Sequence, residues 1–329
     1  MDKETLSNYG WIVICVLVLA VMIALATPFG SYVSNAVKST TQGLFDTNKN
    51  ALNSTGLINI GDQSFDDGAS APEIKRGAGS VIPDDATYTP NGGTALIGNG
   101  TNTFPNIPQT GDTYEEGDYT YKYNKYYSYT SWSSKTSQNG WGVRVKDTSK
   151  TTYGEIISEI AGQPVKNIFY TFLSCYSLTT APAMPSSVTD MQGTFYGCSS
   201  LKTYVGSTDT DGDFSNYTIP NSVTNMACTF YGCSSLATAP KIPSSVTSMS
   251  NTFVWCTSLT TAPAIPSSVT DMTFTFYGCT SLTGTIEVNA NPSHYNECLK
   301  NTQITELLHN GKYGQAIYKA KRRKPVFAE

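Results

Sequence analysis

The feature that most constrains the fold is an internal repeat in the second half of the chain. Five cysteines are separated by 23, 35, 23 and 23 residues, with a phenylalanine three residues before and a leucine three residues after each. A repeat of this length forms one coil of a solenoid, and neighbouring coils bury each other's apolar edges. We therefore predict a solenoid over residues 164–308. Its predicted structural core is Phe172, Cys175, Leu178, Phe195, Cys198, Leu201, Phe230, Cys233, Leu236, Phe253, Cys256, Leu259, Phe276, Cys279 and Leu282.

Two further apolar columns keep the same register. They are Ile168, Met191, Met226, Met249 and Met272, seven residues before each cysteine, and Val165, Val188, Val223, Val246 and Val269, ten residues before it. The 35-residue step contains an insertion near "GSTDTDGDFSNYT", which we expect to form a surface loop. Cys298, preceded by Tyr295, indicates an irregular closing unit with "QITEL" as its last strand.

The phrase "F-Y-G-C-[ST]-S-L" followed by "I-P-S-S-V-T" resembles the BspA-like leucine-rich-repeat surface proteins of bacteria. The resemblance covers residues 164–308 and implies an extracellular solenoid used for attachment or recognition. Pro182, Pro240 and Pro263 lie inside the expected strands. Because proline lacks the N–H that a strand ladder needs, we expect those strands to be short or bent.

The repeated cysteine is open to several chemical interpretations. A zinc site needs close Cys or His groups, and the chain has only His294, His309 and one close pair, Cys228 and Cys233. A nucleophile needs a neighbouring base, and no histidine lies in the five repeats. Five equivalent positions in register cannot all pair as disulfides. We interpret the cysteines as buried thiols that pack as small apolar groups, with Cys228 and Cys233 as the exception to consider. We predict no catalytic residue and no cofactor.

The inserted segment carries the acidic sequence "DTDGD". Asp209, Asp211 and Asp213 are weak calcium candidates, because carboxylate oxygens are the ligands that Ca²⁺ prefers. Phe214 and Pro220 stand where an EF-hand loop would have glycine and glutamate. A solvated turn is the alternative interpretation, and we predict no other metal ligand.

The N-terminal segment is apolar and uncharged over "WIVICVLVLAVMIALA", residues 11–26. About twenty helical residues span a bilayer core of about 30 Å. Residues 1–41 are therefore interpreted as a membrane anchor, a cleaved signal or a pilin-like helix. The sequence "NYGWIV" resembles the start of Flp/Tad-type pilins, although Asn8 stands in place of their glutamate.

The middle of the chain divides into two predicted segments. Residues 42–112 are polar and rich in turn residues, which is typical of a stalk or linker. Residues 113–163 predict a small antiparallel β module of about three strands, with the Asn-Gly turn of "SQNGWG" between two of them and a short helix over Ile156, Ile157 and Ile160. Its tyrosines either bind sugar faces or pair across the strands. Residues 309–329 form a basic tail that is either solvated or attracted to anionic polymers.

Composition narrows the function. Only 14% of residues are charged, as in many exported proteins, and a net charge of −4 argues against a nucleic-acid partner. We predict a mixed α/β chain with an N-terminal transmembrane or pilin-like helix and a C-terminal leucine-rich-repeat solenoid. The predicted function is non-enzymatic adhesion or recognition at a bacterial cell surface, with the membrane as anchor and a host, cell-surface or glycan ligand. The alternative is a pilin-like subunit that packs against like subunits in an extracellular filament displaying the repeats.

Overall fold

The computed structural model describes residues 73–131, 134–207, 213–309, 312–315, 317–318 and 325–326. The chain divides into two compact units, Met1–Asp67 and Gly68–Glu329, and all described residues belong to the second. The predicted N-terminal helix, residues 1–41, and most of the basic tail lie outside the described residues.

Every regular element in these described ranges is a β-strand, so the predicted mixed α/β class is wrong. None of the described segments is a helix able to cross a bilayer. The strands are β1 (Lys75–Arg76), β2 (Thr87–Thr89), β3 (Leu96–Ile97), β4 (Thr113–Glu116), β5 (Tyr119–Ser131), β6 (Ser134–Val145), β7 (Glu159–Ile160), β8 (Gln163–Asn167), β9 (Thr180–Ala181), β10 (Thr203–Tyr204), β11 (Thr283–Val288), β12 (Gln303–His309), β13 (Lys312–Gln315), β14 (Ile317–Tyr318) and β15 (Pro325–Val326).

The first eight strands form one sheet in the order β1-β7-β8-β6-β5-β4-β2-β3. The pairs β1–β7 and β6–β8 are parallel, so the sheet is larger than the predicted three-stranded antiparallel module. Its core is aromatic: Tyr88, Tyr114, Tyr121 and Trp141 are buried, and Tyr88 meets Trp141 edge to face at 6.2 Å. These rings hold the sheet together and do not offer a face for sugars.

Residues 73–112 contribute strands and core side chains to this sheet. Strand β2 pairs with both β3 and β4, and Ile82 and Phe104 are buried. Within the interval that we expected to be a polar linker, this part therefore carries a core, because its few apolar side chains gather on one face.

The Asn-Gly pair predicted to form a hairpin turn lies inside β6, opposite Lys125 and Asn124 of β5. That prediction is wrong, because the glycine does not form a turn but permits two backbones to approach each other closely. A Cβ at Gly140 would lie 3.2 Å from the carbonyl oxygen of Pro164, on the strand that follows in the sheet. Glycine here permits β8 to pack closely against β6.

The predicted short helix is also wrong. All three isoleucines are buried, but Ile156 and Ile157 lie on an irregular segment that leads into β7, and Ile160 lies in β7. Ile160 accepts a hydrogen bond from Trp141 Nε1 at 2.8 Å through its carbonyl oxygen. Pairing of β7 with both β1 and β8 satisfies backbone groups that a helix would have satisfied internally.

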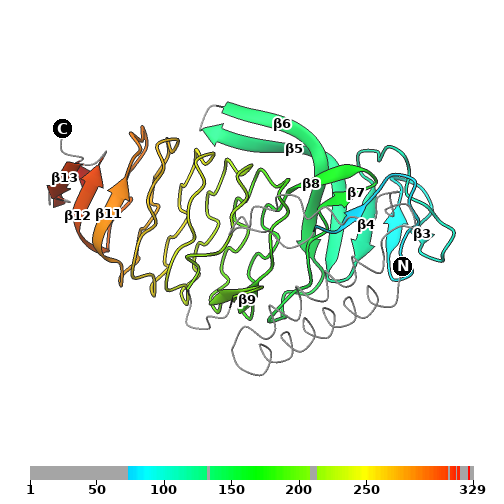
Figure 1. Ribbon diagram of the computed structural model, residues 1–329, viewed down its shortest axis with the longest axis horizontal. Helices are drawn as coiled ribbons and strands as arrows, with labels where there is room; N and C mark the ends of the chain where they lie inside the picture. Colours follow the sequence, from blue (N-terminus) through cyan, green and yellow to red (C-terminus); the bar gives the residue numbers. More distant parts are fainter. Residues whose placement is uncertain are drawn as a thin grey trace, which may run out of the picture. The chain divides into compact units, whose positions relative to one another are not determined.

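The solenoid begins where β8 leaves the sheet and ends at the sheet β11-β12-β13 (Figure 1). Between them the coils are joined by isolated parallel bridges and by the two-residue strands β9 and β10. This confirms the short strands expected from the prolines. In Figure 1 the β5–β6 hairpin extends along the first coils, where Gln138 donates a hydrogen bond to the hydroxyl of Thr189.

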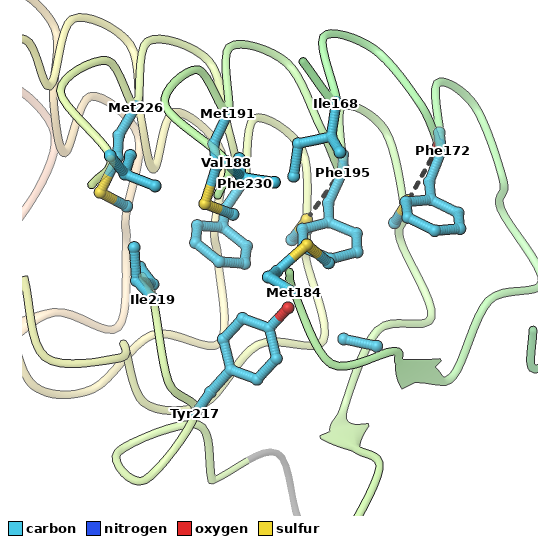
Figure 2. Close-up of a cluster of buried hydrophobic side chains, with 14 of the residues drawn as sticks. Ile168, Phe172, Met184, Val188, Met191, Phe195, Tyr217, Ile219, Met226 and Phe230 are labelled. Atoms are coloured by element: carbon cyan, nitrogen blue, oxygen red, sulfur yellow. Dashed lines mark hydrogen bonds between the residues drawn. The ribbon is translucent and has the colours of Figure 1, made fainter. Parts of the chain in front are cut away.

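The repeated phenylalanines stack along the axis of the solenoid. Successive rings from Phe172 to Phe276 lie 5.4 or 5.5 Å apart and within 18° of parallel. Figure 2 shows part of this column, with Phe172, Phe195 and Phe230 next to Met191 and Met226. The column is the continuous core that no single coil could form alone.

The inserted segment is more than a surface loop. Phe214 and Tyr217 are buried, and the Tyr217 hydroxyl donates to the carbonyl oxygen of Pro182 at 2.9 Å. The Phe214 ring meets Phe230 edge to face at 6.2 Å, and the Tyr217 ring meets Phe195 at 6.5 Å. Its aromatic residues therefore extend the core beside the phenylalanine column (Figure 2).

Truncation of one stacked ring tests this core. Phe230→Ala is expected to lower the free energy of unfolding by about 3–5 kcal/mol, because it removes a buried ring and leaves a cavity. Urea denaturation followed by tryptophan fluorescence measures the change. Tyr231→Ala, at the half-buried neighbouring position, is the matched control and is expected to cost about 1 kcal/mol or less. Equal losses for both variants would contradict the assignment of Phe230 to the core.

Candidate functional surface on the edge of the solenoid

One edge of each coil has a distinctive backbone. We define the edge segments as the residues 169–175, 192–198, 227–233, 250–256, 273–279 and 296–302. In each step, the second, fourth and sixth N–H groups donate to the first, third and fifth carbonyl oxygens of the next segment, at 2.7–3.0 Å. Tyr170 donates to Gln192, Phe172 to Thr194 and Ser174 to Tyr196, and the pattern then repeats. All of these hydrogen bonds point in the same direction along the solenoid.

This direction requires an unusual backbone conformation. The second and sixth residues of every edge segment have positive φ. Glycine fills four of these twelve positions, and the rest are Tyr170, Ser174, Cys228, Asn251, Trp255, Phe274, Glu297 and Asn301. A positive φ at a residue other than glycine is strained. Hydrogen bonds to the next segment stabilise it in the first five edge segments.

Buried hydroxyl groups add a second ladder between coils. Thr229 donates through Oγ1 to the carbonyl oxygens of Met226, at 2.7 Å, and Met191, at 2.9 Å. The equivalent hydroxyl groups of Thr194, Thr252 and Thr275 also donate to the preceding coil, at 2.9–3.2 Å. In the first coil, Thr171 donates to Val143 of strand β6 at 2.9 Å. Strand β6 thus takes the place of a preceding coil, so the sheet caps the solenoid.

The predicted repeat residues all lie in this interior. The five phenylalanines, cysteines and leucines of the predicted core are fully buried. The cysteines are also hydrogen-bond donors: Cys198, Cys233, Cys256 and Cys279 each donate through Sγ to the phenylalanine carbonyl oxygen of the preceding coil, at 2.9–3.2 Å. No disulfide forms among the cysteines from Cys175 to Cys298.

Cys298 occupies a different register from the one its spacing suggested. Phe276 N–H donates to its carbonyl oxygen, as Phe253 N–H does to Thr275, so Cys298 aligns with the threonine column. Leu299 then takes the phenylalanine position, and Thr302 takes that of the cysteine. The residues "QITEL" lie in β12, as predicted.

Burial makes the repeat thiols weak acids. It raises the pKa of Cys198, Cys233 and Cys256 well above the ordinary value, that of Cys279 and Cys298 to about 12, and that of half-buried Cys228 to about 11. Since the thiolate is the nucleophile, these groups are chemically inert at neutral pH.

The calcium hypothesis stays a prediction. Asp209 and Asp211 lie outside the described residues, whereas Asp213 is described and accepts hydrogen bonds from Ser215 N–H, at 2.8 Å, and the hydroxyl of Thr238. These two bonds lower the pKa of Asp213, with the Thr238 bond as the larger cause.

Aromatic side chains line the outside of the edge segments. Tyr196 and Tyr231 stack at 4.4 Å with rings 4° from parallel, and Tyr170 lies 6.0 Å from Tyr196. A second group lies further along, where Trp255 and Phe274 each lie 5.7 Å from Tyr277. We call the surface formed by Phe169, Tyr170, Tyr176, Tyr196, Tyr231, Trp255, Phe274 and Tyr277 the aromatic edge.

Several side chains here are open to solvent. Tyr176 is 62% exposed, Trp255 44% and the neighbouring Leu173 43%. The ring of Trp255 lies on Gly278, where a Cβ would come within 2.8 Å of it. Because Gly278 has no side chain, the indole ring packs directly on the backbone of the next coil. Sequence reasoning missed this surface, although the tyrosine two residues before Cys198, Cys233 and Cys279 is visible in the repeat.

The first coil ends in a small pocket. Arg144, Val145, Thr148, Tyr170, Thr171 and Leu173 line it. Arg144 donates through Nη1 to the carbonyl oxygens of Val143, at 3.0 Å, and Phe169, and its guanidinium carbon lies 5.9 Å from the Phe169 ring. It forms no ion pair within the described residues.

Comparison with known proteins identifies the repeat. Residues 208–315 match the family model described as the BspA type leucine rich repeat region, in 6 copies. This part of the chain is therefore similar to leucine-rich repeats of the BspA type. No curated protein matches the chain.

Two solved structures are similar to parts of the chain. A leucine rich repeat protein of T. pallidum is 25% identical, with 45% of this chain and 63% of that chain covered and a TM-score of 0.36. A leucine-rich repeat protein from Bacteroides ovatus is 20% identical, with 55% and 51% covered and a TM-score of 0.33. The chain thus spans less than two thirds of either protein. The resemblance of the N-terminal segment to pilins finds no support in these matches.

Thiol labelling tests the burial of the cysteines. In native protein at pH 8, iodoacetamide is expected to leave Cys198, Cys233 and Cys256 unmodified over hours, because they are buried and neutral. In 6 M guanidinium, all should react. Peptide mass mapping locates the label, and the denatured sample serves as the control. Rapid native labelling of these three residues would contradict the structure.

The same pKa shifts predict how stability depends on pH. The folded-state pKa of each buried thiol is raised, so its contribution is complete below the unfolded thiol pKa of about 8.5 and is lost as pH rises toward the folded value. For Cys279 and Cys298 that value is about 12. Urea midpoints at pH 7.5, 9.5 and 10.5 should fall in that order. An unchanged midpoint across this range would contradict the shifts.

Proposed function

We propose that this chain is a non-enzymatic adhesion or recognition protein, displayed outside a bacterial cell, that binds a partner protein through its aromatic edge. The observation that carries the proposal is the row of partly exposed tyrosine and tryptophan rings on a stacked backbone. The BspA-type repeat region is consistent with this role, because repeat solenoids present extended binding surfaces.

The aromatic edge has the composition of a protein-binding hot spot. Tyrosine and tryptophan carry much of the energy of protein interfaces, because they bury a large area at low cost in side-chain entropy. Three backbone hydrogen bonds per step hold each edge segment in place. A partner would therefore meet a preorganised surface and would not have to order a loop.

The polar surroundings of the edge fit an extracellular location. Charged residues make up 14% of the chain, and the coils present serine and threonine instead. Thr247 and Thr270 donate through Oγ1 to the coil before them, at 3.1 and 3.2 Å. A neutral hydroxyl surface of this kind depends little on ionic strength, as suits a protein outside the cell.

The interior gives no support to catalysis by the repeated thiols. They are buried, and their raised pKa values leave them without nucleophilic character. Binding through shape and aromatic contact is therefore the role that the repeat supports best.

A binding assay with matched variants tests the proposal. Labelled protein is applied to immobilised extracellular-matrix proteins, to cultured epithelial cells and to a glycan array. We expect saturable binding to a protein surface. Trp255→Ser and Tyr196→Ser should each weaken it about thirtyfold, the effect of losing a hot-spot contact of about 2 kcal/mol.

Val205→Ser is the control, since Val205 is 48% exposed and lies away from the edge segments, on the residues after β10. Its affinity should change by less than about twofold. Binding to none of these surfaces, or binding unaffected by the Trp255 and Tyr196 variants, would contradict the proposal. Binding to the glycan array alone would contradict a protein partner.

A further inference from the structure

The hydrogen-bond ladder of the edge segments is incomplete at its first coil. In each later segment, the first, third and fifth carbonyl oxygens accept N–H groups from the preceding coil. In the first segment these oxygens belong to Phe169, Thr171 and Leu173. Arg144 donates a hydrogen bond to the carbonyl oxygen of Phe169. No group of the described residues donates to the carbonyl oxygens of Thr171 and Leu173.

The reason lies in the path of the capping strand. Strand β6 covers the start of the first coil, where Val143 accepts the Thr171 hydroxyl at 2.9 Å. The strand then ends at Val145, and Lys146 N–H donates to Asp118 at 2.9 Å, away from the coil. Within the described part of the chain, no N–H group therefore donates to the second half of the segment.

A pocket lies at this same place. Its lining includes Thr171 and Leu173 together with Val145, Thr148, Tyr170 and Arg144. Leu173 is 43% exposed whereas Thr171 is only 1% exposed, so the pocket combines an apolar wall with the carbonyl oxygen of Leu173, to which no described group donates. Ladder ends of this kind are templates for pairing with another chain.

We propose that this pocket, which we call the ladder-end site, binds a peptide segment of a partner protein. One backbone N–H group of the peptide donates to the carbonyl oxygen of exposed Leu173 and thereby supplies the bond that every later edge segment receives from the coil before it. The occupant is a peptide because every later coil fills the equivalent position with main-chain N–H groups of alternate residues. The mode resembles the addition of a strand to a sheet edge.

The lining also selects the side chains of the peptide. Leu173, Val145 and Tyr170 favour an apolar residue next to the donating amide. Arg144 lines the pocket, forms no ion pair within the described part of the chain and is already held in place by its bonds to Val143 and Phe169. It favours an acidic residue next to the bound segment.

Peptide selection provides the probe. A phage library of random decapeptides is selected on the full chain, and the best binder is synthesised with a fluorescent label for polarisation titrations. Thr148→Trp, which fills the pocket, and Leu173→Asp, which replaces its apolar wall, are each expected to weaken binding at least tenfold. Both positions are exposed, so both variants should keep the thermal unfolding midpoint of the parent protein.

Two controls separate this site from the aromatic edge. Val205→Asp carries the same change as Leu173→Asp at an exposed position elsewhere and should bind the peptide normally. Trp255→Ser should also bind it normally, although it is expected to lose adhesion. Peptide binding can therefore fail while adhesion persists, and adhesion can fail while peptide binding persists. The two proposals are thus tested independently.

Backbone methylation tests the hydrogen bond directly. Each amide of the peptide is N-methylated in turn, and methylation of the amide that donates to Leu173 should weaken binding about two- to twelvefold, the range for one lost hydrogen bond. Methylation of the two neighbouring amides should have no such effect. A peptide that tolerates methylation at every amide, binding that survives both pocket variants, or a library that yields no binder would each overturn the proposal.

Discussion

The structure depends on the ladder of hydrogen bonds between edge segments, which all run in one direction, whereas bonds outside these segments, such as Thr224 N–H to the carbonyl oxygen of Thr189 at 3.0 Å, run the opposite way. An ordinary strand sends its N–H groups alternately to both sides, whereas the edge segments send theirs only toward the following coil. This requires positive φ at the second and sixth positions, including bulky residues such as Tyr170, Trp255 and Phe274. The third, fifth and seventh N–H groups bond three residues back within the same coil, as Cys198 does to Phe195 at 3.0 Å, and in most segments the first donates to a side-chain oxygen two residues back, as Gln192 does to Asp190 Oδ1 at 2.9 Å. The backbone at the edge is thus satisfied without long strands.

The side-chain ladders follow from this backbone. Once the coils are in register, equivalent residues lie above one another, so the phenylalanine rings stack. For the same reason, the hydroxyl and thiol groups of each coil donate to equivalent carbonyl oxygens. The eight-stranded sheet joins the ladders at their start: Tyr153 and Tyr119 lie 5.2 and 6.3 Å from Phe172, and Tyr153 donates to Cys175 Sγ at 3.4 Å. The apolar face of the first coil is covered, as a terminal repeat requires.

Much of the solenoid could be read from the sequence, because its period fixes which residues share a column. The direction of the ladder could not be read, since nothing in "NTFVW" shows that Asn251 and Trp255 have positive φ. Asn139–Gly140 and Ile156–Ile160 were misjudged for a related reason: contacts with distant strands outweighed local turn and helix preferences. The register of Cys298 was also missed, because its spacing from Tyr295 resembles that of the repeat. The hydrogen bonds place Cys298 at the third position of its edge segment, four positions before the one that the repeat cysteines hold. The candidate site was the least predictable part, because exposure of a tyrosine depends on its neighbours in the adjacent coils.

Because the ladder runs in one direction, the middle of the solenoid and its two ends are under different structural constraints. Every edge segment between the first and the last accepts from the segment before it and donates to the segment after it in the same manner, and this holds even across the 35-residue step, where Gly193, Phe195 and Gly197 keep all three bonds. Duplication or deletion of a whole unit in the gene would therefore leave each junction chemically unchanged. The length of the solenoid is free to vary during evolution, whereas the sequences that begin and finish it are not interchangeable.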